Sequence, residues 1–173
     1  IRGIEVGLEA YSSVSGTGAM TLLTDGFGTG NTDSSFDEAP TWVEGIANTT
    51  SSSGAEKRQS SFFGVDTASP NGDRFAVIYN GGWICKSINA SGVSALQLSY
   101  NWRGDNDAND SGDDGLVEYR VGGNCTDTTG WTTLQNHDLQ NDNNWSTQSA
   151  FALPGSASNA TFLLRYRANS ENN

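Results

Sequence analysis

The chain has 173 residues and a formal net charge of −11, from 20 acidic and 9 basic side chains. This length suits one domain of roughly 100–200 residues that buries its own hydrophobic core. The acidic balance argues against binding to nucleic acids or anionic membrane surfaces, and no apolar run approaches the ~18 residues of a membrane span. Because the sequence begins without Met or a signal peptide, we interpret it as a processed or excised piece.

The first ten residues, IRGIEVGLEA, alternate between apolar and polar side chains. Ile4, Val6 and Leu8 share one face, and Glu5 and Glu9 share the other, which is the period-two pattern of a β-strand. Residues 11–18 are rich in Ser and Gly and are typical of a flexible connector. The sequence therefore predicts an N-terminal strand arm with its connector over 1–18 and one domain over 19–173.

Short strand patterns recur along this domain and are separated by Gly, Asn and Asp turns. They cover residues 20–23, 41–44, 61–63, 74–79, 83–88, 95–102, 115–121, 131–134, 145–153 and 161–167. No segment has sustained helical periodicity, and the aromatic content (5 Trp, 5 Tyr, 7 Phe) argues against disorder. The predicted fold is all-β: an antiparallel jelly-roll β-sandwich with an extended N-terminal donor-type strand.

Cys85 and Cys125 are the only cysteines, and each lies on or beside a predicted strand. Their spacing and the single histidine do not suit a zinc site. We predict a structural disulfide, which indicates an oxidising and hence extracellular location. The alternative is a pair of buried free thiols.

The segment 103–115 holds five carboxylates and two Asn side chains, which are the hard oxygen ligands that calcium prefers. It lacks the twelfth-position Glu of an EF-hand. We predict a calcium site at Asp105, Asp107, Asp110 and Asp113, with Ca²⁺ as the one cofactor. The alternative is a solvated hairpin loop in which these residues serve the turn.

Six Asn-x-Ser/Thr sequons are candidates for N-glycosylation in a secreted protein: Asn48, Asn89, Asn109, Asn124, Asn144 and Asn159. We expect the Asn124 sequon to be the least accessible, because Cys125 lies within it. In a host without the transferase none of the six is modified.

The sequence does not indicate an enzyme. His137 is the only histidine and lies in a polar run, and neither a nucleophile elbow nor a phosphate-binding glycine loop is present. The tryptophans are candidates for stacking against sugars, although in a strand they more often belong to the core. We expect Trp145 to be the most exposed of them.

Several segments, each weak alone, resemble the MAM-type jelly roll and related carbohydrate-binding modules. They are Asp25-Gly26-Phe27, SPNGDRFAVIYNGG, LQLSYNWRGD, GLVEYRVGG, WTTLQNHDLQNDNNW and FLLRYRANSENN. The resemblance implies an extracellular binding or structural role, often with bound calcium, and no catalysis. In that family a last strand similar to Y-x-x-I-D-D-I-x-V follows the counterpart of FLLRYRA, and here Ile1-Arg2-Gly3-Ile4-Glu5-Val6 resembles that strand.

A sandwich without this strand exposes core and an unpaired backbone edge. The N-terminal strand could fill the gap in its own domain or in the next subunit, and both closures stay open here. Closure in the next subunit is heterologous and grows an open filament of copies of the chain.

From this the sequence predicts a secreted structural subunit of a pilus-like filament or surface layer. Inserted side chains would be Ile1, Ile4, Val6 and Leu8, and Phe162, Leu164 and Tyr166 would line the acceptor groove. The alternative is a carbohydrate-binding or adhesive module of a larger surface protein.

Overall fold

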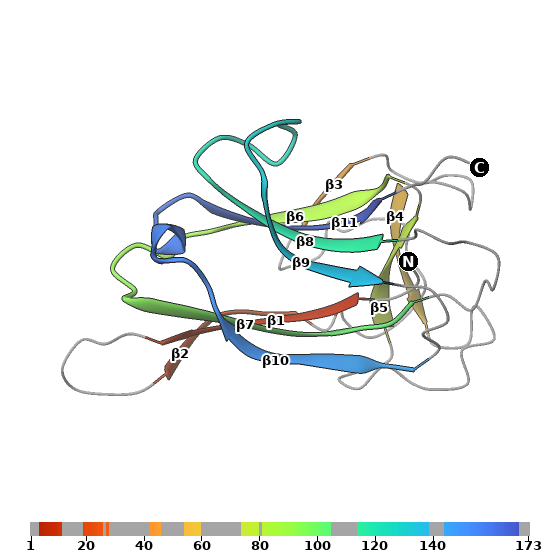
Figure 1. The fold of residues 1–173 in the computed structure, drawn as a ribbon, viewed down its shortest axis with the longest axis horizontal. Coiled ribbons are helices and arrows are strands. Elements are labelled where there is room, and N and C mark those ends of the chain that lie inside the picture. The colour runs from red at the N-terminus through yellow and green to blue at the C-terminus, as the bar shows by residue number, and fades with distance from the viewer. Residues whose placement is uncertain are drawn as a thin grey trace.

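The computed structural model describes residues 4–11, 19–25, 27, 42–45, 54–59, 74–79, 81–104, 114–138 and 144–169. Within these ranges the chain forms eleven β-strands and one short 3-10 turn, η1 (Gly155–Ala157). The strands make two antiparallel sheets that lie face to face (Figure 1). None of the described residues belongs to a helix long and apolar enough to cross a membrane.

Six of the described strands form the first sheet. Its order is β10 (Ser146–Ala152), β7 (Ala95–Trp102), β1 (Ile4–Tyr11), β5 (Arg74–Tyr79) and β4 (Gly54–Gln59), and β2 (Ala19–Asp25) also pairs with β1. The second sheet contains, in order, β3 (Val43–Gly45), β6 (Trp83–Ile88), β11 (Phe162–Asn169), β8 (Asp114–Val121) and β9 (Thr132–Asp138). Consecutive strands from β5 to β8 alternate between the two sheets.

The hydrophobic core lies between the sheets and is built from alternate side chains of each strand. On β11, Phe162, Leu164 and Tyr166 are fully buried in this core, whereas Leu163 packs in a separate cluster with the two cysteines. Tyr100 of β7 faces β11 across the core, with its ring centre 5.6 Å from that of Tyr166. Alternate side chains of β11 therefore face the core between the two sheets.

The all-β antiparallel prediction is confirmed, and the strand boundaries shift by a few residues. One strand was not predicted: β4, with the sequence GAEKRQ, lacks the apolar alternation of the other strands. It forms because each of its residues has a register partner on β5 and because Ala55 is fully buried. Charged side chains are common on such edge strands, where they discourage pairing with another chain. The predicted strand over 61–63 lies outside the described residues.

Candidate functional site

β1 occupies a central position in the first sheet. All eight of its residues pair with β7, and on its other side it pairs with β2 and meets β5 at Ile4. Val6 is the register partner of Tyr100, and Leu8 is the register partner of Leu98. Both partners are buried in the core. The apolar positions of the N-terminal strand therefore coincide with core positions of its neighbour, and the space that β1 fills is called the β1 slot below.

The three residues predicted to line an acceptor groove, Phe162, Leu164 and Tyr166, lie on β11 in the second sheet. Both sides of β11 are paired, one with β6 and the other with β8. The strands that pair with β1 are β7, β2 and β5, which the sequence did not nominate. Sequence reasoning chose β11 because it comes last in the chain, but neighbours in a sheet are decided by topology. Ile1 lies outside the described residues.

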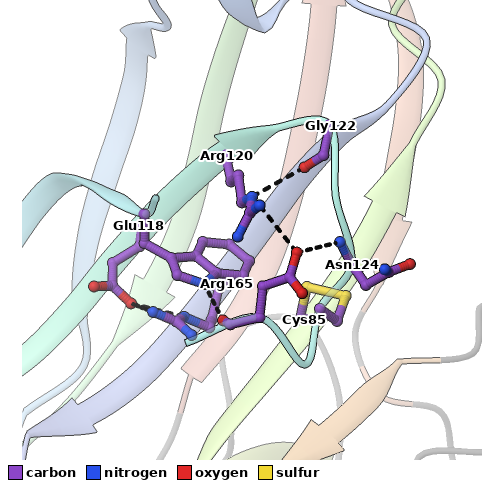
Figure 2. The surroundings of a disulfide bond; sticks show 9 residues. Cys85, Glu118, Arg120, Gly122, Asn124 and Arg165 are labelled. Atoms are coloured by element: carbon purple, nitrogen blue, oxygen red, sulfur yellow. Dashed lines mark hydrogen bonds and ion pairs between the residues drawn. A yellow bond between two sulfur atoms is a disulfide. The ribbon is translucent and has the colours of Figure 1, made fainter. Parts of the chain in front are cut away.

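The predicted disulfide between Cys85 and Cys125 is present, and the Cα atoms of the two residues are 5.7 Å apart. It joins β6 to the loop over 122–131, which connects β8 to β9 and folds back over the outer face of the second sheet (Figure 2). Leu163 is buried beside the two sulfur atoms. The bond indicates an oxidising environment, because cytosolic reductants keep such thiols reduced.

Further contacts brace this disulfide-linked loop. Arg120 forms an ion pair with Asp127 at 3.0 Å and donates a hydrogen bond from Nε to the Gly122 carbonyl at 3.1 Å. The Asp127 carboxylate also accepts a hydrogen bond from the Asn124 main-chain N–H at 2.9 Å. Gly123 has a φ of 80°, and a Cβ atom there would lie 2.5 Å from the Asp127 carboxylate. The loop therefore needs glycine at this position, both for its backbone conformation and for the approach of Asp127.

Beside the loop, the outer face of the second sheet carries a buried charge cluster of Glu118, Arg165 and Arg167. Arg165 donates a hydrogen bond from Nε to Oε2 of Glu118 at 2.8 Å, and its Nη2 forms an ion pair with the same oxygen at 2.7 Å. Nε of Arg167 lies 3.3 Å from this oxygen. The Arg165 guanidinium also lies 3.8 Å from the centre of the Trp131 ring. Burial lowers the pKa of Arg165, and the Glu118 carboxylate opposes that effect.

Sequence reasoning missed this cluster. The sequence does contain a signal that could have revealed the cluster. Charged residues occur at alternate positions of two otherwise apolar strands, with Glu118 on β8 and Arg165 and Arg167 on β11. Residues that alternate in this way share one face of a strand. Only the register, which sets Glu118 opposite Arg165, shows that the two charges meet.

His137 lies between the two sheets. Its Nε2 is 2.5 Å from the hydroxyl of Tyr100, and its ring stacks on Trp102 with the centres 4.2 Å apart. Burial lowers the pKa of His137, and burial raises the pKa of Tyr100 far above its ordinary value. The contacts described here give His137 a packing and hydrogen-bonding role across the core, and the prediction that the chain is not an enzyme stays a prediction.

All five tryptophans lie in the described part of the chain, and none stands alone on the surface. Trp42 is buried, and the other four are half-buried. Trp145 packs edge-on against the buried ring of Phe75 with the centres 5.5 Å apart, and the expectation that it is the most exposed of the five stays a prediction. Trp83 packs beside the disulfide.

The predicted calcium ligands Asp105, Asp107, Asp110 and Asp113 lie outside the described residues. Elsewhere in the described part of the chain, no group of three or more His, Cys, Asp or Glu side chains is arranged to hold a metal ion. Calcium binding therefore stays a prediction from the sequence.

Four of the six sequons fall within the described residues, and all four Asn side chains are exposed: Asn89, Asn124, Asn144 and Asn159. The Asn124 side chain is exposed like the other three, whereas Cys125 beside it is buried, and the expectation that this sequon is the least accessible of the six stays a prediction. Asn48 and Asn109 lie outside the described residues.

Comparison with models of protein families finds no match to this chain. Searches among curated proteins and among solved structures likewise find none. What the described residues show is an all-β chain with antiparallel sheets, and the resemblance to MAM-type domains stays a prediction from the sequence.

Proposed function

We propose that the chain is a structural subunit of an extracellular filament or surface layer, and that its subunits are joined by exchange of β1. The observation that carries the proposal is the place of β1 in the first sheet. Pairing with β7 along its whole length and with β2 on its other side gives β1 more backbone contact than an edge strand has.

The β1 slot is suited to a strand from another copy, because an identical strand makes identical contacts in it. Without β1, every residue of β7 from Ala95 to Trp102 would lose a register partner. Unpaired strand edges of this kind recruit a strand of another chain, with main-chain hydrogen bonds for affinity and alternate side chains for specificity. Because the donor strand and the slot are different surfaces, the contact is heterologous and leads to open growth.

An extracellular location agrees with the Cys85–Cys125 disulfide and with the net charge of −11, which keeps an assembly solvated. We also infer that the connectivity is that of a jelly roll, because β5 to β8 alternate between the sheets. Phe162, Leu164 and Tyr166 then belong to the core beneath the first sheet, where they support the slot from the opposite layer.

A deletion of residues 1–11 tests the proposal directly. We expect the full chain to form fibres or sheets in electron micrographs, and the deletion variant to remain monomeric and to bind a synthetic peptide with the sequence IRGIEVGLEAY. Assembly that survives the deletion would refute strand exchange. A deletion variant that folds and keeps affinity for a sugar would favour the adhesive module.

A cross-strand cysteine pair tests whether β1 is exchanged between subunits, without removing β1. Ala10 of β1 and Met20 of β2 are register partners, so Ala10→Cys and Met20→Cys together place two thiols at disulfide distance. If β1 is exchanged, oxidation links neighbouring subunits, and a non-reducing gel shows a ladder of multimers. A monomer with an internal disulfide as the only product would show that β1 pairs within its own chain. The control is Met20→Cys alone, which should give no ladder.

A further inference from the structure

Three connections meet at one end of the sandwich: the β6–β7 turn, the β8–β9 loop and the segment from η1 to β11 (Figure 1). The main-chain N–H of Ala90 donates to the Asn159 carbonyl at 2.8 Å, and the N–H of Gly122 donates to the Thr161 carbonyl at 2.8 Å. Two sequons far apart in the sequence, Asn89-Ala90-Ser91 and Asn159-Ala160-Thr161, therefore lie in adjoining turns.

The two acceptor side chains share one local contact, a hydrogen bond that Oδ1 accepts from the main-chain N–H two residues further on. Oδ1 of Asn89 accepts hydrogen bonds from the Ser91 N–H at 3.1 Å and from the Ser91 hydroxyl at 2.7 Å. Oδ1 of Asn159 accepts from the Thr161 N–H at 3.0 Å. Both Asn side chains are exposed, and their Nδ2 atoms make no hydrogen bond to the residues that the structure describes. The atom that carries an N-linked glycan is thus available in each turn.

The two chain segments that carry these turns lack charge, although the chain as a whole is strongly acidic and the adjoining β8–β9 loop carries the Arg120–Asp127 ion pair. No charged residue occurs over 87–102 or over 143–164, the stretches that contain the two turns. Segments without acidic side chains do not repel an anionic glycosyl donor. They also have no ionised side chains of their own, and an attached glycan would hydrate them.

We propose that this end of the sandwich is an N-glycosylated surface with Asn89 and Asn159 as its paired acceptors. Nδ2 of each Asn attacks the anomeric carbon of a sugar carried on a diphosphate-linked donor. The N–C bond forms, the bond from carbon to the diphosphate oxygen breaks, the diphosphate leaves with the electron pair, and a base of the transferase takes one amide proton. The proposal does not depend on strand exchange, since it applies to a free subunit and to an assembled one.

The first test is secretion of the full chain from a eukaryotic cell with a sequon-reading oligosaccharyltransferase, followed by peptide mass spectrometry. We expect glycans on both Asn89 and Asn159. Ser91→Ala should remove the first and Thr161→Ala the second, and the matched control Ser156→Ala, at the same end but in no sequon, should keep both. Secreted chain with neither Asn modified would overturn the proposal.

The second test asks whether the folded chain is an acceptor. Purified unglycosylated protein is incubated with a soluble sequon-specific N-glucosyltransferase and UDP-glucose. We expect one hexose on Asn89 and one on Asn159 in the native chain. Modification of these two positions only after reduction and unfolding would contradict the accessibility on which the proposal rests.

Discussion

Replacement of Glu118 by Gln should destabilise the fold more than any other loss of a single charge on the outer face of the second sheet. The exposed fractions of the paired side chains are 6% for Glu118 and 8% for Arg165, so water cannot solvate the arginine once its partner is neutral. Removing one member of a buried ion pair typically costs about 3–5 kcal/mol.

The lower end of that range applies here. The amide carbonyl of the substituted side chain would still accept a hydrogen bond from Arg165, and the guanidinium would keep its contact with the Trp131 ring. Arg167 is 28% exposed and can turn toward solvent. We therefore expect a loss of about 3 kcal/mol, which in a chain of this size lowers the Tm by about 6–12 °C.

Urea unfolding followed by circular dichroism measures this loss in free energy. The matched control is Asp127→Asn, which removes a carboxylate that is 35% exposed and should cost only about 0–1 kcal/mol. A double variant, Glu118→Leu with Arg165→Met, should lie within about 1 kcal/mol of the wild type, because apolar replacement of both partners removes the unpaired charge. A Glu118→Gln variant within about 1 kcal/mol of the wild type would refute the reasoning.

The remaining predictions concern other parts of the chain. Replacing both cysteines by Ala should cost about 4 kcal/mol for a bond that spans 40 residues, measured by urea unfolding; an unchanged midpoint would contradict a structural role. His137 has a lowered pKa in the folded chain, so the unfolded chain binds more protons and stability should fall as the pH drops below about 6.5; His137→Gln should flatten this pH profile. Gly45→Ala should destabilise by about 1–3 kcal/mol, because a Cβ atom would lie 1.8 Å from the Trp83 ring, whereas Gly155→Ala meets nothing within 4 Å and should not. If the loop containing Asp105, Asp107, Asp110 and Asp113 binds calcium, EDTA should lower the Tm, and an unchanged Tm would remove that hypothesis.

The fold class could be predicted from the sequence because strand formation leaves a local, period-two pattern. The segment 161–167 was predicted as a strand, and the structure places Phe162, Leu164 and Tyr166 on its inward face and Arg165 on its outward face. The same rule failed for β4, whose charged sequence resembles a loop. Its strand conformation comes from pairing with β5, which lies 15 or more residues further along the chain.

The candidate sites likewise divide into those that the sequence could predict and those that depend on distant contacts. Cys85 and Cys125 could be paired from the sequence because they have no other partner. The exposure of Trp145 could not be judged, since Phe75, against which it packs, is 70 residues away. The Asn89 and Asn159 sequons were two of six candidates until the backbone hydrogen bond between their turns set them side by side.

By itself, the sequence determined that the chain is an acidic, all-β protein with one disulfide and an N-terminal strand whose apolar side chains alternate. These properties depend on residue type and on spacing within a few positions. The tertiary structure alone decided that β1 lies between β7 and β2, that Glu118 meets Arg165 beneath Trp131, and that the Asn89 and Asn159 sequons lie in adjoining turns. Each of these depends on which distant strands pair and in which register, and that choice is made by the burial of the whole core.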